Sequence, residues 1–269
     1  VQNVVTLYGG GSLGVFLYGR CALNEMGQAC QFCSLAPNRS RQTEFPLVLN
    51  PDQVREALRT ALLDVSVPIT QVMINGGNFP DPDDGFRYYV TVVSAARQAI
   101  ATVGRDVELH LIVGPPRDLD LVRLLRGLDV SVAMNLELGD PSLFAQFCPG
   151  KHQLYGQEHI RMALTACVKH LGLGRVHSIF LGGLEPVESL CDAMTSVAHS
   201  GVTPIINVFH PDPDTPLADS PSPSPAQIIN MGKVLQEIFA EHRFMRPFYL
   251  DCGRNSLDTE AYRGWFAAC

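Results

Sequence analysis

Thr70–Asn78 read TQVMINGGN, and this stretch contains the pattern that decides the fold. Thr70–Ile74 is a short, nearly continuous apolar run, which favours a β-strand buried on both faces. The run leads into Gly76-Gly77-Asn78, and a longer amphipathic segment follows at Phe86–Thr102. A buried strand, a polar glycine-rich turn and a helix form the repeating unit of α/β proteins.

The same pattern recurs along the whole chain. Strands are predicted at Leu13–Tyr18, Thr70–Ile74, Glu108–Val113, Ser131–Leu136, His177–Leu181 and Pro204–Phe209. Helices are predicted at Pro51–Leu63, Phe86–Thr102, Asp118–Arg126, Gln157–Leu171, Val187–His199 and Pro225–His242. Strands that alternate with helices pair in parallel through right-handed crossovers. We therefore expect one α/β domain over residues 1–269, to which flanking segments of a longer protein can be attached.

Polar or glycine-rich residues follow several of these strands, which favours a β/α barrel over a doubly wound sheet. Glu137 follows the fourth strand, Gly182-Gly183-Leu184-Glu185 the fifth and His210 the sixth. In a β/α barrel such strand ends converge on one mouth, where the active site lies. About six strand–helix units predict a partial barrel or a nearly complete TIM-like barrel.

Composition and charge exclude several classes of function. The chain has 269 residues and a net charge of −7, which disfavours nonspecific binding to nucleic acids or anionic membranes. No apolar run reaches the roughly 18 residues of a membrane-spanning helix. The sequence starts at Val1 without a recognisable signal peptide, so we expect a cytoplasmic protein.

Three of the eight cysteines lie close together, in a predicted loop at residues 20–35. Cys21, Cys30 and Cys33 directly follow the first strand, and three thiolates can hold three corners of an iron–sulfur cluster. A structural zinc site needs four protein ligands, and no fourth Cys or His is near in sequence. An iron–sulfur cluster is the favoured interpretation, and zinc or plain reduced thiols are the alternatives. The scattered cysteines are expected to be mostly buried as small apolar side chains.

Further motifs stand at the ends of the predicted strands, in chain order. They are Gly76-Gly77-Asn78 after the second strand, Asn135-Leu136-Glu137 after the fourth, Ser178–Glu185 (SIFLGGLE) along the fifth, and Asp214–Asp219 (DTPLAD) with Cys252-Gly253-Arg254 near the C-terminal end. Together with the cysteine loop, whose last pair encloses Phe32, they resemble the radical S-adenosylmethionine (SAM) superfamily, closest to its biotin-synthase-like branch. The resemblance runs from about Leu13 to Arg254.

The resemblance implies roles for these residues. Gly76, Gly77 and Asn78 would receive the methionine amino group of SAM. Asn135 and Glu137 would contact its ribose. Ser178, Gly182 and Glu185 fall in the family's GxIxGxxE segment, where the glutamate serves adenine or backbone packing. Phe32 and Arg254 complete the implied cofactor-binding set, and Lys151, in a turn after the fourth strand, could pair with the SAM carboxylate.

The sequence departs from the family pattern at two positions. The family's first two cysteines are usually three residues apart, whereas here the spacing is CX8CX2C and Met26 stands at the usual first position. Longer first spacings occur in the superfamily and the thioether of Met26 is a poorer ligand, so Cys21 is kept as the third ligand. Asn78 replaces the usual glutamate, and an amide oxygen lacks the charge-assisted strength of a carboxylate.

The implied activity is that of an enzyme with two cofactors, a [4Fe–4S] cluster and SAM. Reductive cleavage of SAM would generate a carbon radical that acts on a small-molecule substrate, with flavodoxin or ferredoxin as electron donor. His210 is expected to face the mouth, and His210 and Cys252 are the substrate-side catalytic candidates. Transfer of a 3-amino-3-carboxypropyl group from SAM, a zinc-stabilised ligand-binding barrel and an iron–sulfur redox sensor without turnover are the alternatives.

Overall fold

Seven short strands form one curved sheet in the computed structural model, which describes residues 3–42, 46–249, 252 and 255–268. The strands are β1 (Thr6–Gly9), β2 (Ser12–Phe16), β3 (Gln71–Asn75), β4 (Glu108–Ile112), β5 (Ser131–Ala133), β6 (Val176–Gly182) and β7 (Thr203–Val208). Their order in the sheet follows the chain, from β1 to β7. Neighbouring strands pair in parallel throughout the series from β2 to β7. The predicted partial β/α barrel is therefore confirmed.

All six predicted strands are present, with ends shifted by a few residues. The fourth predicted strand is shorter than expected and ends at Ala133. The sequence analysis missed β1, which pairs antiparallel with β2 through a tight turn at Gly10 and Gly11. Gly10 has a φ of 51°, a left-handed conformation that glycine adopts without strain.

The predicted helices are also found. They are α3 (Pro51–Leu63), α4 (Pro82–Val103), α7 (Gly156–Leu171), α8 (Val187–His199) and α9 (Pro225–Glu241). The segment predicted as a helix at 118–126 is instead a 3-10 helix, η1 (Leu119–Leu125), and Gly127 follows it at a φ of 76°. The short elements α1 (Ala22–Glu25), α2 (Leu35–Arg41), α5 (Pro141–Phe147), α6 (Pro149–Leu154), α10 (Asp258–Tyr262) and η2 (Trp265–Ala268) were not predicted.

Local sequence explains where the helices begin. Asn50 and Ser224 each make a reciprocal capping box at the start of α3 and α9, and proline follows both caps. Asp81 accepts hydrogen bonds from the amides of Asp83 and Asp84 at the start of α4. Asp81 is therefore the N-cap of α4.

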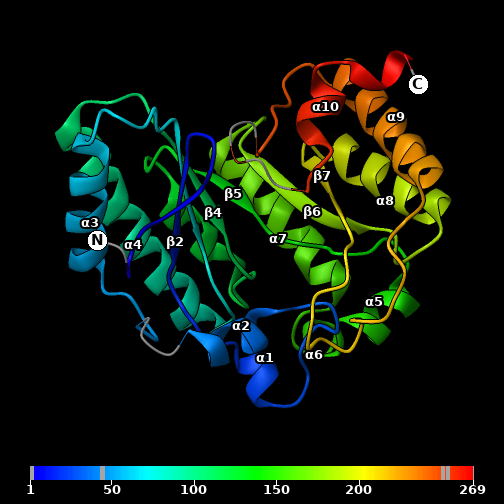
Figure 1. The fold of residues 1–269 in the computed structure, drawn as a ribbon, viewed down its shortest axis with the longest axis horizontal. Coiled ribbons are helices and arrows are strands. Elements are labelled where there is room, and N and C mark those ends of the chain that lie inside the picture. The colour runs from blue at the N-terminus through cyan, green and yellow to red at the C-terminus, as the bar shows by residue number, and fades with distance from the viewer. Residues whose placement is uncertain (1–2, 43–45, 250–251, 253–254, 269) are drawn as a thin grey trace.

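The helices cover the outer face of the sheet. In Figure 1, α3 and α4 lie together on one side of the molecule, and α8 and α9 lie together on the other. Apolar side chains from these helices and the strands form the main core, for example Leu58, Val92, Val132, Phe180 and Leu235. This layer holds the strands in register, so that their carboxyl ends reach the same edge.

A smaller core fills the inner, concave face of the sheet. Met73, Ala133, Ile179 and Ile205 point inward from four different strands and pack against the C-terminal segment at Phe248–Tyr249 and Cys252. Gln71 donates a 2.5 Å hydrogen bond to the carbonyl oxygen of Phe248 at the amino end of β3. The C-terminal segment therefore closes the barrel from the amino ends of the strands, and the carboxyl ends stay free for a site. Across the described residues, no helix combines the length and apolar character needed to cross a bilayer.

Candidate active site

A cavity of about 850 Å³ opens at the carboxyl ends of the strands. This volume lies in the upper part of the roughly 300–1,000 Å³ range of ligand-binding pockets. Its wall includes the three loop cysteines Cys21, Cys30 and Cys33, together with Phe32, Gly76, Gly77, Asn78, Asn135, Glu137 and Lys151. Ten predicted site residues from separate parts of the chain thus share one cavity.

Backbone contacts hold the cysteine loop at the mouth. Cys21 is the N-cap of α1, and the amide of the next residue, Ala22, donates a 2.8 Å hydrogen bond to the carbonyl of Asn78. The amide of Gln31 donates to the carbonyl of Phe147, and that of Gly150 donates to the carbonyl of Gln28. The loop is therefore fastened at one end to the turn after β3 and at the other to α5 and α6.

The thiols of Cys21 and Cys30 lie near enough to Cys33 to affect its pKa electrostatically. Cys33 is accessible from the cavity, yet the protein atoms around its sulfur desolvate it and raise the pKa of the thiol to about 11. A backbone hydrogen bond at Leu35 opposes this rise, and negative charge on Cys30 and Cys21 adds to it. A cationic metal centre would relieve this repulsion between thiolates.

Cys148 is a fourth thiol near the site, which the sequence did not reveal. It is fully buried at the junction of α5 and α6, and its S–H donates to the sulfur of Cys30. This hydrogen bond is the largest cause of a lowered pKa at Cys30; burial opposes it, and the charge of Lys151 supports it. Cys148 follows α5 far from the loop in sequence, and only the fold brings the two thiols together.

The donor chemistry of the three loop cysteines fits a metal centre. Thiolates bind both zinc and iron–sulfur clusters. In a cluster each thiolate binds a different iron, so the three thiols on this cavity wall can hold three of its corners.

The turn after β3 requires its two glycines. A Cβ at Gly77 would lie 1.7 Å from the carbonyl oxygen of Arg20, and one at Gly76 would lie 2.6 Å from the hydroxyl of Tyr89. Asn78 follows and directs its amide nitrogen to the sulfur of Cys21 at 3.7 Å. Its amide oxygen accepts a 3.2 Å hydrogen bond from the hydroxyl of Tyr155.

A buried ion pair lies on the cavity wall. Lys151 Nζ is 2.5 Å from Glu137 Oε1, and the two side chains are only 15% and 8% exposed. Burial lowers the pKa of Lys151, but the charge of Glu137 and of the nearby thiolates outweighs it, so the net pKa is raised. Glu137 has a φ of 65°, and its amide and carbonyl bond to Ile179 and Leu181 of β6. The carboxylate is thus held in place by the sheet.

Two buried amide oxygens at the cavity have no protein partner. They are Oδ1 of Asn135, after β5, and Oδ1 of Asn207, on β7. Buried acceptors are normally satisfied, so these oxygens fit a ligand that brings hydrogen-bond donors. Asn135 was predicted from its motif. Asn207 was not, although an asparagine within the apolar run PIINVF was a signal for it.

Some predicted site residues lie in the barrel wall. Ser178 accepts a hydrogen bond from the amide of Leu136. Gly182 faces α9, because a Cβ there would lie 2.7 Å from the sulfur of Met231. Glu185 accepts from the amides of Gly139 and Asp140, which agrees with the backbone-packing role expected for it. None of Ser178, Gly182 and Glu185 lines the cavity.

The two catalytic candidates also lie away from the cavity. His210 was expected to face the mouth, but it is exposed and its Nδ1 lies 3.3 Å from Asp212. The reason is alternation along extended chain: Phe209 is buried, which directs the next side chain to solvent. Cys252 is fully buried within the inner core. Arg254 lies outside the described residues.

The geometry defines a partial β/α barrel with a cysteine-lined mouth, and solved structures share this fold. The structure of HydG, a maturase of the [FeFe]-hydrogenase, matches with a TM-score of 0.61 and 13% identity, over 83% of this chain and 48% of that one. A radical SAM methyltransferase from Sphaerobacter thermophilus matches with a TM-score of 0.60 and 14% identity, over 84% of this chain and 63% of that one. The protein therefore has the fold of a radical SAM enzyme.

A sequence relative matches over most of the chain. Bacteriochlorophyllide c C-7(1)-hydroxylase of Chlorobaculum limnaeum is 24% identical over an alignment of 245 residues that covers 86% of this chain. The match covers 61% of the hydroxylase, so this chain spans about three fifths of its length. No protein-family model matches the chain.

Proposed function

We propose that the protein is a radical SAM enzyme of the biotin-synthase-like type, in which Cys21, Cys30 and Cys33 hold a [4Fe–4S] cluster. The observation that carries this proposal is the convergence of the three thiols on a cavity that also contains unpartnered polar atoms. When bound, the cluster and SAM together supply a reductively generated carbon radical. The three thiols on the cavity wall support a metal centre there, and the shared fold supports an enzyme.

The cavity residues would bind and orient SAM. Asn78 Oδ1 can accept from the amino group, and the ammonium of Lys151 can pair with the carboxylate. Glu137 and Asn135 can accept hydrogen bonds from ribose hydroxyls. Gly76 and Gly77 line the cavity, and their lack of side chains lets the turn pack against Arg20 and Tyr89. Lys151 is already paired with Glu137, so its positive charge is kept in place before SAM arrives.

The substrate would be a small molecule with an apolar surface. Phe16, Ile112, Ile179 and Leu181 line the cavity beside the polar groups. The matching hydroxylase acts, by its name, on a bacteriochlorophyllide, which agrees with an apolar substrate in a biosynthetic reaction. A reduced flavodoxin or ferredoxin would supply the electron. The described cysteines are free thiols, which fits work in a reducing compartment such as the cytoplasm.

One contact favours an alternative outcome of SAM cleavage. The Asn78 oxygen is occupied by the hydroxyl of Tyr155, and Asn78 lacks the charge of a carboxylate. SAM held differently at this position would present another C–S bond to the cluster. Transfer of a 3-amino-3-carboxypropyl group is therefore the second candidate activity.

Anaerobic reconstitution followed by reductive SAM cleavage tests both candidates. We expect close to four irons per chain, and methionine with 5′-deoxyadenosine as products identified by mass spectrometry. Products that carry the aminocarboxypropyl group would select the second candidate. Stoichiometric zinc without iron, in protein purified without oxygen, would refute both.

Variants of single cysteines show which thiols are ligands. Alanine at Cys21, Cys30 or Cys33 should remove SAM cleavage and most of the iron. Cys191→Ala is the matched control, because Cys191 is a half-buried thiol on α8 that does not line the cavity. It should keep the iron content of the unmodified protein.

A further inference from the structure

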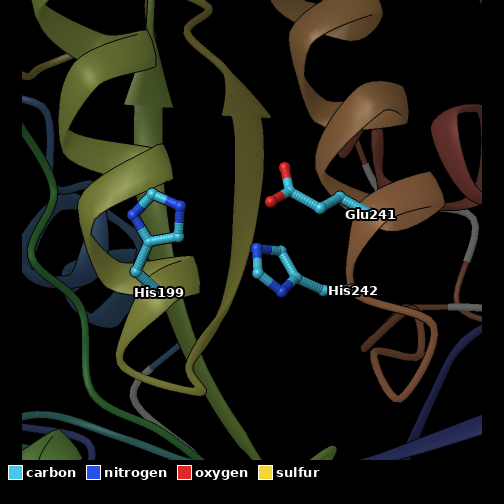
Figure 2. Close-up of side chains that lie close together, drawn as sticks. All are labelled: His199, Glu241 and His242. Atoms are coloured by element: carbon cyan, nitrogen blue, oxygen red, sulfur yellow. The ribbon is translucent and has the colours of Figure 1, made fainter.

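Three metal-binding side chains meet on the surface, away from the cysteine cavity. His199 is the last residue of α8, Glu241 is the last residue of α9, and His242 is the C-cap of α9. One donor atom of each lies within 4.8 Å of the donor atoms of the other two. Figure 2 shows the two imidazoles and the carboxylate turned toward one another from the two helix ends.

Packing holds the two histidines near each other. Helices α8 and α9 are in contact, and the rings of His199 and His242 are 5.8 Å apart with their planes at 74°. The amide of His242 donates a 2.9 Å hydrogen bond to the carbonyl of Ile238, and Phe244 packs against the edge of its ring. His199 and Glu241 are exposed, so their side chains can adjust to a ligand.

The backbone around the group favours a cation. Both α8 and α9 end at this point, and each helix C-terminus carries a partial negative charge of about half an electron. The Glu241 carboxylate adds a full negative charge. Arg243, which directly follows His242, is the nearest positively charged residue in the sequence, and its side chain is exposed. Two helix ends and a carboxylate thus lie beside the two imidazoles.

We propose that His199, Glu241 and His242 form a site for a divalent transition-metal ion, with zinc as the preferred ion. Two imidazoles and one carboxylate are a donor set that zinc uses, and imidazole disfavours magnesium and calcium. Bonds of about 2.0–2.2 Å to one ion need donor atoms that lie close to one another, and these three lie within 4.8 Å. Water would complete the coordination.

The site lies at the opposite edge of the sheet from the cysteine mouth. Helices α8 and α9 start after the carboxyl ends of β6 and β7 and run back, so they end near the amino edge of the strands. None of the three residues lines the cavity. The ion would therefore act as a clamp between two helices that cover β6 and β7, and it would take no part in SAM chemistry.

Histidine footprinting tests the site without interference from the cysteines. The full chain with its reconstituted cluster is treated with diethyl pyrocarbonate, with and without added zinc, and the modified residues are identified by mass spectrometry. Zinc should slow modification of His199 and His242 at least tenfold. His170, which lies in the last turn of α7, should react at the same rate in both samples. Equal rates at His199 and His242 with and without zinc would overturn the proposal.

Thermal unfolding of variants provides an independent readout. Zinc should raise the unfolding midpoint of the unmodified chain, because a ligand that binds only the folded state stabilises it. The exposed substitution His199→Ala should abolish this rise, and Glu241→Gln should weaken zinc affinity about tenfold. His170→Ala should keep the full rise. A rise in His199→Ala as large as in the unmodified chain would refute the clamp.

Discussion

Lys151 Nζ lies 2.5 Å from Glu137 Oε1, and both side chains are almost closed to water. Glu137 follows β5, whereas Lys151 lies on α6. Loss of one partner leaves a buried charge without compensation, at a cost of about 3–5 kcal/mol. We expect Glu137→Gln to lower the free energy of unfolding by an amount in that range.

A double-mutant cycle checks the cause of this loss. Because Lys151→Met with Glu137→Gln leaves no unpaired charge, the double variant should be less destabilised than the sum of the single variants. Chemical denaturation of the cluster-free chains measures each term. Additive effects would show that the two groups do not interact.

Cys21 and Cys148 should respond differently to removal. Cys21 lines the cavity, whereas Cys148 is fully buried and donates to Cys30. We expect Cys148→Ala to keep its iron but to give a cluster with a more negative reduction potential, because hydrogen bonds to the ligand sulfurs raise the potential. Cys21→Ala should lose most of its iron. The reverse pattern would make Cys148 the third ligand in place of Cys21.

Gly77 should be intolerant of any side chain. A Cβ there would meet the carbonyl oxygen of Arg20 at 1.7 Å, which forces the backbone that carries Cys21 to move. Gly77→Ala should therefore lower iron loading severalfold. Gly19→Ala is the control, two residues before Cys21 in the segment after β2, since its Cβ would find its nearest neighbours at 3.6 Å. Similar iron content in both variants would contradict this role.

Substitution of Asn135 should weaken SAM binding, whereas substitution of Ser178 should lower the stability of the fold. Asn135 Oδ1 is buried without a partner, so Asn135→Leu should leave stability unchanged or improved while it weakens SAM binding about tenfold, the effect of one lost hydrogen bond of roughly 1.4 kcal/mol. Ser178→Ala removes an acceptor from the amide of Leu136 and should cost stability without a direct effect on SAM affinity. Equilibrium dialysis and denaturation separate the two results.

His177 should make the protein sensitive to acid. Burial lowers its pKa to about 3, with a further contribution from His110. The unfolded chain then binds the proton more tightly than the folded chain, so stability is lost as pH falls below about 6.5 and the loss continues towards pH 3. Between pH 7 and pH 5 this amounts to about 2 kcal/mol. His177→Gln should flatten that part of the stability profile, and an unchanged slope would argue against the assignment.

The sequence predicted the repeating elements well because their signals are local. Apolar runs and capping residues identified all six strands of the parallel part and the limits of α3 and α8 to the residue. The helices α5 and α6 were missed because six or seven residues make fewer than two helical turns, and β1 was missed because its exposed and half-buried residues form no apolar run. The cysteine loop and the glycine turn were also visible, since a motif needs only a few adjacent residues.

The sequence by itself determined the α/β pattern, the cysteine loop and the residues that stand after each strand. Only the tertiary structure decided which of those residues share the cavity: it kept Asn135 and Glu137, added Asn207, and placed His210 on the surface. It also brought Cys148 to Cys30 and His199 to His242. The physical reason is that such contacts depend on the curvature of the sheet and on the packing of helices across it. Neither the curvature nor the packing can be predicted from a short stretch of sequence.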